Sequence, residues 1–138
     1  MISHVTLGVR DLARAAPFYR AIAAEMTLVE RAFEDDGGPE MLCFHVAGLD
    51  APRLYVATPF DERAATAGNG TMIALIAPSR ASVDAAYAAG LAQGGTDAGP
   101  PGPRPHYEPD YYGAYLRDPD GNKLHLVHRD ALQSFRQA

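Results

Sequence analysis

The chain contains an internal repeat, in which positions of the first half match positions 68 places later, so that residue 4 aligns with residue 72. The match covers the apolar face of a strand, a helix-capping residue and an aromatic residue on the following helix. The aligned pairs are His4 with Met72, Val5 with Ile73, Leu7 with Leu75, Asp11 with Ser79, Ala13 with Ala81, and Tyr19 with Tyr87. Two related halves with the same order of elements are therefore predicted.

The first half has the pattern of a strand, a helix and three further strands. Residues 2–9 alternate apolar and polar side chains, which is typical of a half-buried strand. Asp11 is a suitable N-cap for a helix whose apolar residues have the spacing of one helical face. Three short β-prone runs follow, separated by turn residues, at 27–33, 41–46 and 53–57.

The second half begins with the same order, and a proline-rich segment interrupts it. A strand is predicted at 71–77, followed by a helix that Ser79 or Ser82 caps. Residues 99–110 carry four prolines in their first eight positions, which exclude a regular helix or a central strand. A semi-rigid loop is predicted there, either bordering a site or serving as a plain surface connection.

A β-hairpin is predicted between Tyr111 and Arg129. Its two runs are joined by the sequence Asp-Pro-Asp-Gly at 118–121, in which Pro presets the turn and Gly tolerates its left-handed exit. In the second run, alternation places Leu124 and Leu126 on the core face and His125 on the other. Each half is therefore predicted to be a βαβββ module.

Length and charge limit the class of protein. The 138 residues fit one domain, 1–138, built of a first module at 1–60 and a second at 69–129. The 12 Lys and Arg residues face 17 acidic ones, for a net charge of −5, which argues against a nucleic-acid partner. No basic leader or long apolar run suggests a membrane partner, so a cytoplasmic protein with an inert buried Cys43 is expected.

Four positions are predicted to face one cavity between the modules. If a pseudo-twofold axis relates the modules, the sheet faces opposite the helices enclose a shared space, and His4, Tyr55, Met72 and His125 face it. The two histidines either have a functional role there or are wall residues hydrogen-bonded to each other or to water. Tyr55 and Tyr115 either contact a ligand or fill the space between the modules.

The chain resembles the vicinal oxygen chelate superfamily, which includes glyoxalases, bleomycin resistance proteins and extradiol dioxygenases. Three segments carry the resemblance: HVTLGVRDLARAAPFYRAI near the start, GTMIALIAPSRASVDAAYAAGLAQGG in the middle, and YYGAYLRDPDGNKLHLV near the end. The resemblance implies an α+β fold of paired βαβββ modules that form a curved mixed sheet around a cavity. In the enzymes of the family it also implies a divalent metal that chelates two neighbouring substrate oxygens.

The resemblance implies metal ligands at the first and last strand of each module. His4 is a family-typical ligand and His125 occupies the position usually held by Glu, whereas Met72 and Tyr55 depart from the usual His or Gln and carboxylate. Since Zn²⁺ or Ni²⁺ prefers three or four N or O ligands, a Zn, Ni, Mn or Fe ion would need a further donor. Candidates are Tyr55, His106, Glu108 or the substrate itself.

Two functions are consistent with these residues. In the first, the protein is a metal-dependent lyase or isomerase, less readily a dioxygenase, with His4 and His125 as ligands and Tyr55 or a loop carboxylate as the acid or base. In the second, it is a metal-free binding or resistance protein that sequesters its ligand. In both, Met72, Tyr115 and His106 contact a small organic molecule, and the resemblance implies a homodimer.

Overall fold

The computed structural model describes residues 1–137, and Ala138, the last residue of the predicted domain, lies outside the described residues. The first four strands form one mixed sheet in the order β1-β4-β3-β2, with β1 parallel to β4 and the other pairs antiparallel. Their bounds are β1 His4–Gly8, β2 Leu28–Arg31, β3 Met41–Val46 and β4 Arg53–Ala57. Helix α1, Leu12–Glu25, begins after Asp11, whose side chain caps it by accepting from Arg14 N.

The second sheet repeats this topology in the order β5-β8-β7-β6. Its strands are β5 Met72–Ile76, β6 Thr96–Pro103, β7 Tyr112–Arg117 and β8 Lys123–His128. Helix α2, Arg80–Ala92, is capped by Ser79, and a 3₁₀ helix, η1 Asp130–Arg136, follows β8. The α+β fold of two βαβββ units and the hairpin near the end are therefore confirmed.

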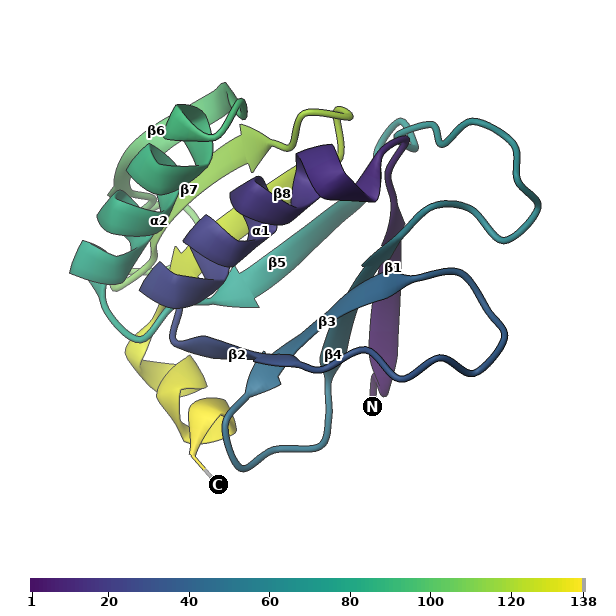
Figure 1. Cartoon of the computed structure of the whole chain (residues 1–138). Helices are drawn as coiled ribbons and strands as arrows, with labels where there is room; N and C mark the ends of the chain where they lie inside the picture. Colours follow the sequence, from purple (N-terminus) through teal and green to yellow (C-terminus); the bar gives the residue numbers. More distant parts are fainter. Residues whose placement is uncertain (138) are drawn as a thin grey trace.

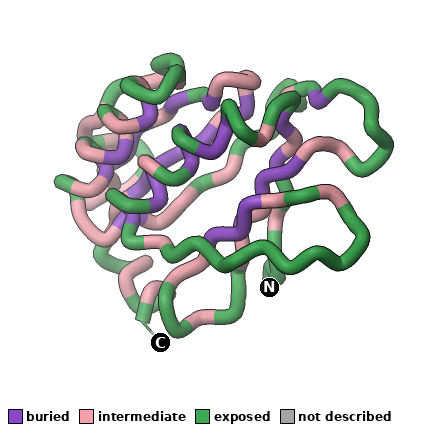
Figure 2. Tube along the Cα trace, viewed as in Figure 1, coloured by how far each residue is buried: buried purple, intermediate pink, exposed green. Residues whose placement is uncertain are grey.

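The two helices lie side by side and pack against each other, so each module contributes one helix to the contact between the modules (Figure 1). A Cβ on Gly90 of α2 would lie 2.5 Å from Leu116 Cδ1 and 3.2 Å from Phe18 Cε2, so a side chain at this position would have to displace the end of Leu116. Buried residues gather along α1, α2 and the strands that they cover (Figure 2). The core is thus continuous across the two modules.

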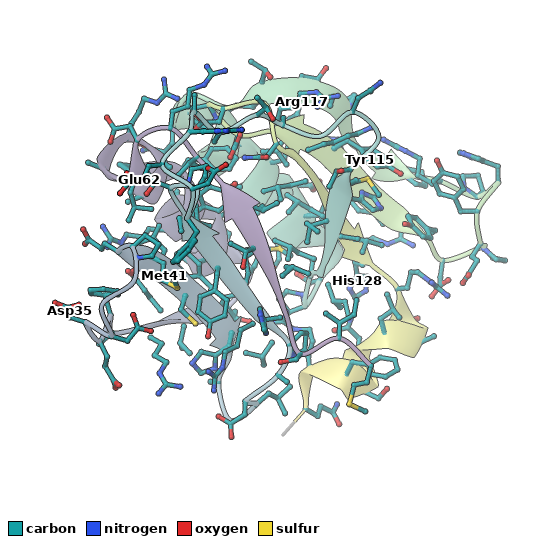
Figure 3. The ribbon with its side chains drawn as sticks, turned by 90° about the vertical axis from the view of Figure 1, so that its right-hand side faces the viewer. Asp35, Met41, Glu62, Tyr115, Arg117 and His128 are labelled. Carbon is teal, nitrogen blue, oxygen red and sulfur yellow. The ribbon has the colours of Figure 1, made fainter. Side chains whose placement is uncertain are left out.

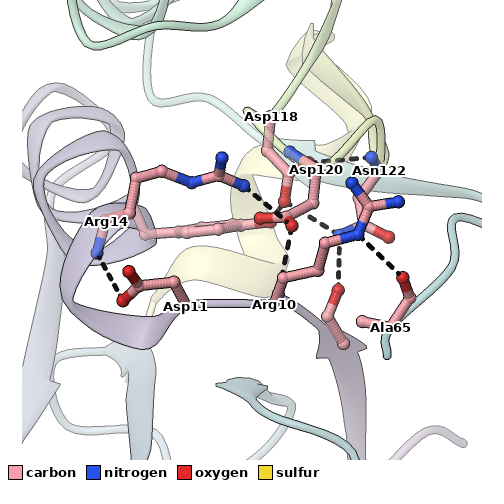
Figure 4. Close-up of polar contacts among 9 residues, drawn as sticks. Arg10, Asp11, Arg14, Ala65, Asp118, Asp120 and Asn122 are labelled. Carbon is pink, nitrogen blue, oxygen red and sulfur yellow. Dashed lines mark hydrogen bonds and ion pairs between the residues drawn. The ribbon is translucent and has the colours of Figure 1, made fainter. Parts of the chain in front are cut away.

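The turn of the hairpin joins the second module to the first (Figure 4). Asp118 is buried and accepts hydrogen bonds from Tyr19 Oη at 2.6 Å and from Asn122 Nδ2 at 2.8 Å. Asn122 Nδ2 also donates to the carbonyl of Gly8, and Asp120 accepts from Arg10 N and Arg14 Nη2. These bonds fix the end of β1 and the start of α1 against the second sheet.

The proline-rich segment differs from its prediction. Residues 99–103 of the predicted loop belong to β6, Thr96–Pro103, whereas residues 104–110 lie outside a strand as predicted. Its place at the edge of the sheet explains this result, because an edge strand needs hydrogen-bond donors on one side only. Register shifts between Asp97 and Gly99 and between Gly99 and Gly102 accommodate the prolines.

Among residues 1–137, no helix is both long enough and apolar enough to cross a membrane.

Candidate functional site

A cavity of about 390 Å³ lies on the face of the first sheet that points away from the core. Leu7, Leu54 and Val56 point into the core, so the alternate residues of the same strands point to the opposite face. All lining residues belong to the first module: His4, Thr6, Arg31, Ala32, Phe33, Glu34, Asp36, Met41, Cys43, Arg53 and Tyr55.

His4, Arg53 and Tyr55 form the polar centre of this cavity. The rings of His4 and Tyr55 meet edge to face, with centroids 5.5 Å apart. Arg53 Nη1 donates to Tyr55 Oη at 3.3 Å, and this hydrogen bond raises the pKa of the guanidinium. His4 Nδ1 lies 3.1 Å from Ser3 Oγ, while its Nε2 has no hydrogen bond to any of the described residues. The centre therefore presents a cation, a phenol and an imidazole.

On the second sheet, His125 is held between two tyrosines and is only 1% exposed. Its ring stacks on Tyr115 with centroids 4.0 Å apart, and a Cβ on Gly113 would lie 2.5 Å from its Cε1. Nδ1 lies 2.9 Å from the Ala114 carbonyl, which can only accept, so Nδ1 carries the hydrogen. Nε2 then accepts from Tyr111 Oη at 2.6 Å.

Burial sets the protonation of this group. Desolvation lowers the pKa of His125, and the charges of Arg104 and Lys123 lower it further, so that the imidazole is neutral near pH 7. Burial also raises the pKa of Tyr111 above its usual value. The pKa of Tyr115 is raised to about 12, again chiefly by burial. These shifts oppose proton transfer from Tyr111 to His125, and the pair is a stable neutral hydrogen bond.

The stack continues as an aromatic cluster along this face. Tyr107 packs against His106, with centroids 4.2 Å apart, and against Tyr111, with centroids 5.0 Å apart. Lys123 Nζ lies 5.1 Å above the ring of Tyr115, within the range of a cation–π interaction. In Figure 3, Tyr115 and His128 lie on the opposite side of the molecule from Met41 and Asp35, with β1 and β5 between them.

The structure does not bring the four predicted cavity residues together within one chain. His4 and Tyr55 share the cavity of the first sheet. Met72 lines a separate groove of about 500 Å³ between β1, β4 and β5. His125 lines neither space, because Tyr111 and Tyr115 enclose it. Tyr115 and His106 both belong to the aromatic cluster, where His106 is exposed at its outer end.

Arg53 and Tyr111 contact the predicted site residues directly but were not predicted themselves. Arg53 lies two places before Tyr55, so the alternation that places Tyr55 off the core also places Arg53 there. That signal was available in the sequence. Tyr111 had no such signal, since it precedes β7 and meets His125 only because the chain returns from the loop after β6.

The donor set of a single chain does not fit a divalent metal ion. Among residues 1–137, no three His, Cys, Asp or Glu side chains are grouped closely enough to hold one. His4 and His125 lie on different sheets, and Nε2 of His125 already accepts a hydrogen bond from Tyr111. A site with three or four N or O ligands is not formed by these residues.

Comparisons with known proteins agree with the fold and with each other. The sequence profile of the Glyoxalase/Bleomycin resistance protein/Dioxygenase superfamily matches residues 1–126. A glyoxalase/bleomycin resistance protein from Albidiferax ferrireducens T118 is 37% identical, with a TM-score of 0.78, over 94% of this chain and 98% of that one. No curated protein matches the chain.

More distant solved structures share the fold. A glyoxalase-related enzyme from Fulvimarina pelagi is 20% identical, with a TM-score of 0.67, over 94% of this chain and 88% of that one. A lactoylglutathione lyase from Agrobacterium tumefaciens is also 20% identical, with a TM-score of 0.60, over 93% of this chain and 92% of that one.

Proposed function

The chain belongs to the glyoxalase/bleomycin resistance protein/dioxygenase superfamily, and from this premise we propose that it binds a small organic molecule in the first-sheet cavity. The observation that carries the proposal is the convergence of His4, Arg53 and Tyr55 in a cavity of about 390 Å³. That volume is within the usual range for small-molecule sites, which combine apolar walls with a few placed polar groups. Phe33 and Met41 supply apolar wall here.

The possible metal ligands of a single chain favour a binding function over a metal-dependent one. A metal-dependent lyase or isomerase would need His4 together with donors from a second chain, and the Nε2 atom of His4 has no hydrogen-bond partner among the described residues. That observation keeps metal-dependent chemistry as the second candidate. The aromatic cluster of the second sheet, including Tyr115 and His106, would then face the ligand from a partner chain.

A homodimer is part of the proposal. The first-sheet cavity is lined by one module only, so one side of a bound molecule faces away from the chain. A second copy placed against this face would enclose the ligand more fully. Small-molecule sites usually bury most of the surface of their ligand.

The test is a screen of small organic molecules by amide NMR, with metal analysis of protein purified without a metal-affinity tag. We expect compounds that shift the amides of β1 and β4 and that lose affinity in Tyr55→Phe and His4→Ala. Compounds that shift only other regions would contradict the proposed site. Stoichiometric metal that is lost in both His4→Ala and His125→Ala would favour the metal-dependent candidate instead.

A further inference from the structure

We propose that the first-sheet cavity recognises the carboxylate of an organic acid, bound by Arg53, Tyr55 and His4. This inference rests on the proposed function, because it names the class of ligand for the same cavity. Strand register, the hydrogen bonds already formed, the charge of Arg53 and the composition of the wall each support it.

Strand register brings the three side chains together. β1 and β4 are parallel neighbours, and His4 and Arg53 are Cα partners across them. Tyr55 is two residues along β4 from Arg53 and therefore lies on the same face. The three groups are thus held by adjacent strands of a sheet, which positions them more rigidly than a loop would.

The hydrogen bonds already formed leave donors on two residues that line the cavity. Three of the five guanidinium N–H groups of Arg53 are used, by the Asp50 carbonyl, Tyr55 Oη and Asp50 Oδ1, which leaves two. Tyr55 accepts from Arg53, so its own hydroxyl hydrogen remains to be donated. A ligand that satisfies these groups must bring acceptor oxygens, and a carboxylate brings two.

The charge of Arg53 is not neutralised by a buried acid. The carboxylate of Asp50 lies 3.5 Å from it but is fully exposed, at 101% of its reference area, so water screens this pair. Glu34 and Asp36 also line the cavity. Both are exposed and belong to the segment between β2 and β3, where Glu34 lies 4.0 Å from Arg31. The strands therefore supply the cations, Arg53 and Arg31, whereas the acids come from the exposed segment between β2 and β3.

The rest of the wall fits an apolar body. Phe33, Met41 and Ala32 contribute carbon surface beside the donors, and the volume of about 390 Å³ accommodates a small molecule. The ligand class is accordingly a compact monocarboxylic acid with an apolar part, aliphatic or aromatic.

The experiment compares benzoate, phenylacetate and hexanoate with their primary amides, by amide NMR at pH 7. We expect the acids to shift the backbone amide signals of β1 and β4. We also expect them to bind at least about tenfold more tightly than the primary amide ligands, since a charge-assisted hydrogen bond is roughly twice as strong as a neutral one. Arg53→Met should weaken the acids by roughly 10- to 100-fold. Arg53→Lys should recover part of the affinity, because it restores charge without the planar fork.

Two variants separate recognition from general damage. Tyr55→Phe should weaken the acids more than the primary amides, because the hydroxyl donates to both but its bond to a carboxylate is charge-assisted. Arg63→Met, in an exposed segment outside the cavity, should change neither affinity. An unchanged dispersed amide spectrum of Arg53→Met checks that the fold is intact.

Each remaining outcome decides against one proposal or both. Carboxylate recognition would be overturned if the primary amides bound as tightly as the acids, or if Arg53→Met left the affinity for the acids unchanged. The proposed function would then still stand. Carboxylate recognition alone is also overturned if no acid binds while uncharged compounds still occupy the cavity. If nothing binds there, the proposed function fails as well.

Discussion

His125 is the residue whose protonation the fold constrains most, because its ring is enclosed and both nitrogens have partners. Nδ1 donates to Ala114, Nε2 accepts from Tyr111, and the ring has no room for a water molecule on the side of Gly113. A protonated imidazole would have two donors, and Tyr111 would have to turn its hydrogen elsewhere. The folded state therefore disfavours the charged form of this side chain.

This constraint predicts a pH dependence of stability. The folded pKa of His125 lies below its unfolded value of about 6.5. The unfolded chain therefore binds the proton more readily, and this group's contribution to stability is present above about pH 6.5 and is lost as the pH falls. His125→Gln should flatten the decrease in the free energy of unfolding between pH 7.5 and 5.5, which for one proton is at most about 1.4 kcal/mol per pH unit.

Denaturant unfolding at several pH values measures the slope for wild type and variant. His106→Gln is the matched control, since His106 is exposed at the end of the same aromatic cluster. Equal slopes in wild type and His125→Gln would show that the enclosed imidazole does not couple to folding.

The sequence identified the direction of His125 but not its partners. Alternation along the strand placed it off the core face, which is correct, since Leu124 and Leu126 are fully buried on the other face. Enclosure by Tyr111 and Tyr115 depends on ring stacking and on the space left by Gly113. Period-two patterns carry no information on whether an off-core side chain meets solvent, a cavity or its neighbours.

Among the elements, the hairpin turn has a structural role that its motif alone did not disclose. Asp118 accepts from Tyr19 on α1, so the turn of the second module is bonded to the helix of the first. The repeat mate of Tyr19 is Tyr87, whose hydroxyl donates to Asp97 within the second module. Two matched tyrosines thus make one buried bond between modules and one exposed bond within a module.

This pair of tyrosines allows a prediction with an internal control. Tyr19→Phe should lower the free energy of unfolding by roughly 1–3 kcal/mol, because it leaves a buried carboxylate oxygen with one donor fewer. Tyr87→Phe should cost less, about 0.5–1 kcal/mol, since water can replace its partner at Asp97. Chemical denaturation measures both. Equal losses would mean that the bond between modules adds nothing beyond an ordinary surface hydrogen bond.

Local sequence patterns predicted most helices and strands. They failed for β6, where the position of the segment in the sheet decided whether it forms a strand. The bounds of β3 and β4 agree with the runs predicted at 41–46 and 53–57, and Asp11 and Ser79 cap their helices. β6 was missed because proline argues against central strands, whereas the strand lies at an edge. Edge position is a property of the assembled sheet.

At the scale of the whole molecule, the way in which one module packs on the other could not be predicted from the sequence. The repeat predicted which face of each sheet is apolar, yet both helices pack together while the predicted cavity residues lie on separate sheets. β1 and β5 each end their sheet with an open edge. The groove beside them is largely apolar, lined by residues that include Val5, Phe44, Leu54 and Leu75.

β1 contributes residues both to the first-sheet cavity and to this groove, so a second copy paired along the open edges would border both, and the edges therefore give a test of the proposed homodimer. Ile2, Met72 and Phe135 line the groove and are 64%, 40% and 67% exposed, and a second copy would cover them. Light scattering after size exclusion should give twice 14.8 kDa for the wild type. Met72→Glu should give the mass of one chain, because a buried carboxylate without a partner is costly at an interface. Phe60→Glu is the control, since Phe60 is 86% exposed outside the groove. A monomeric wild type, or a dimer indifferent to Met72→Glu, would contradict this interface.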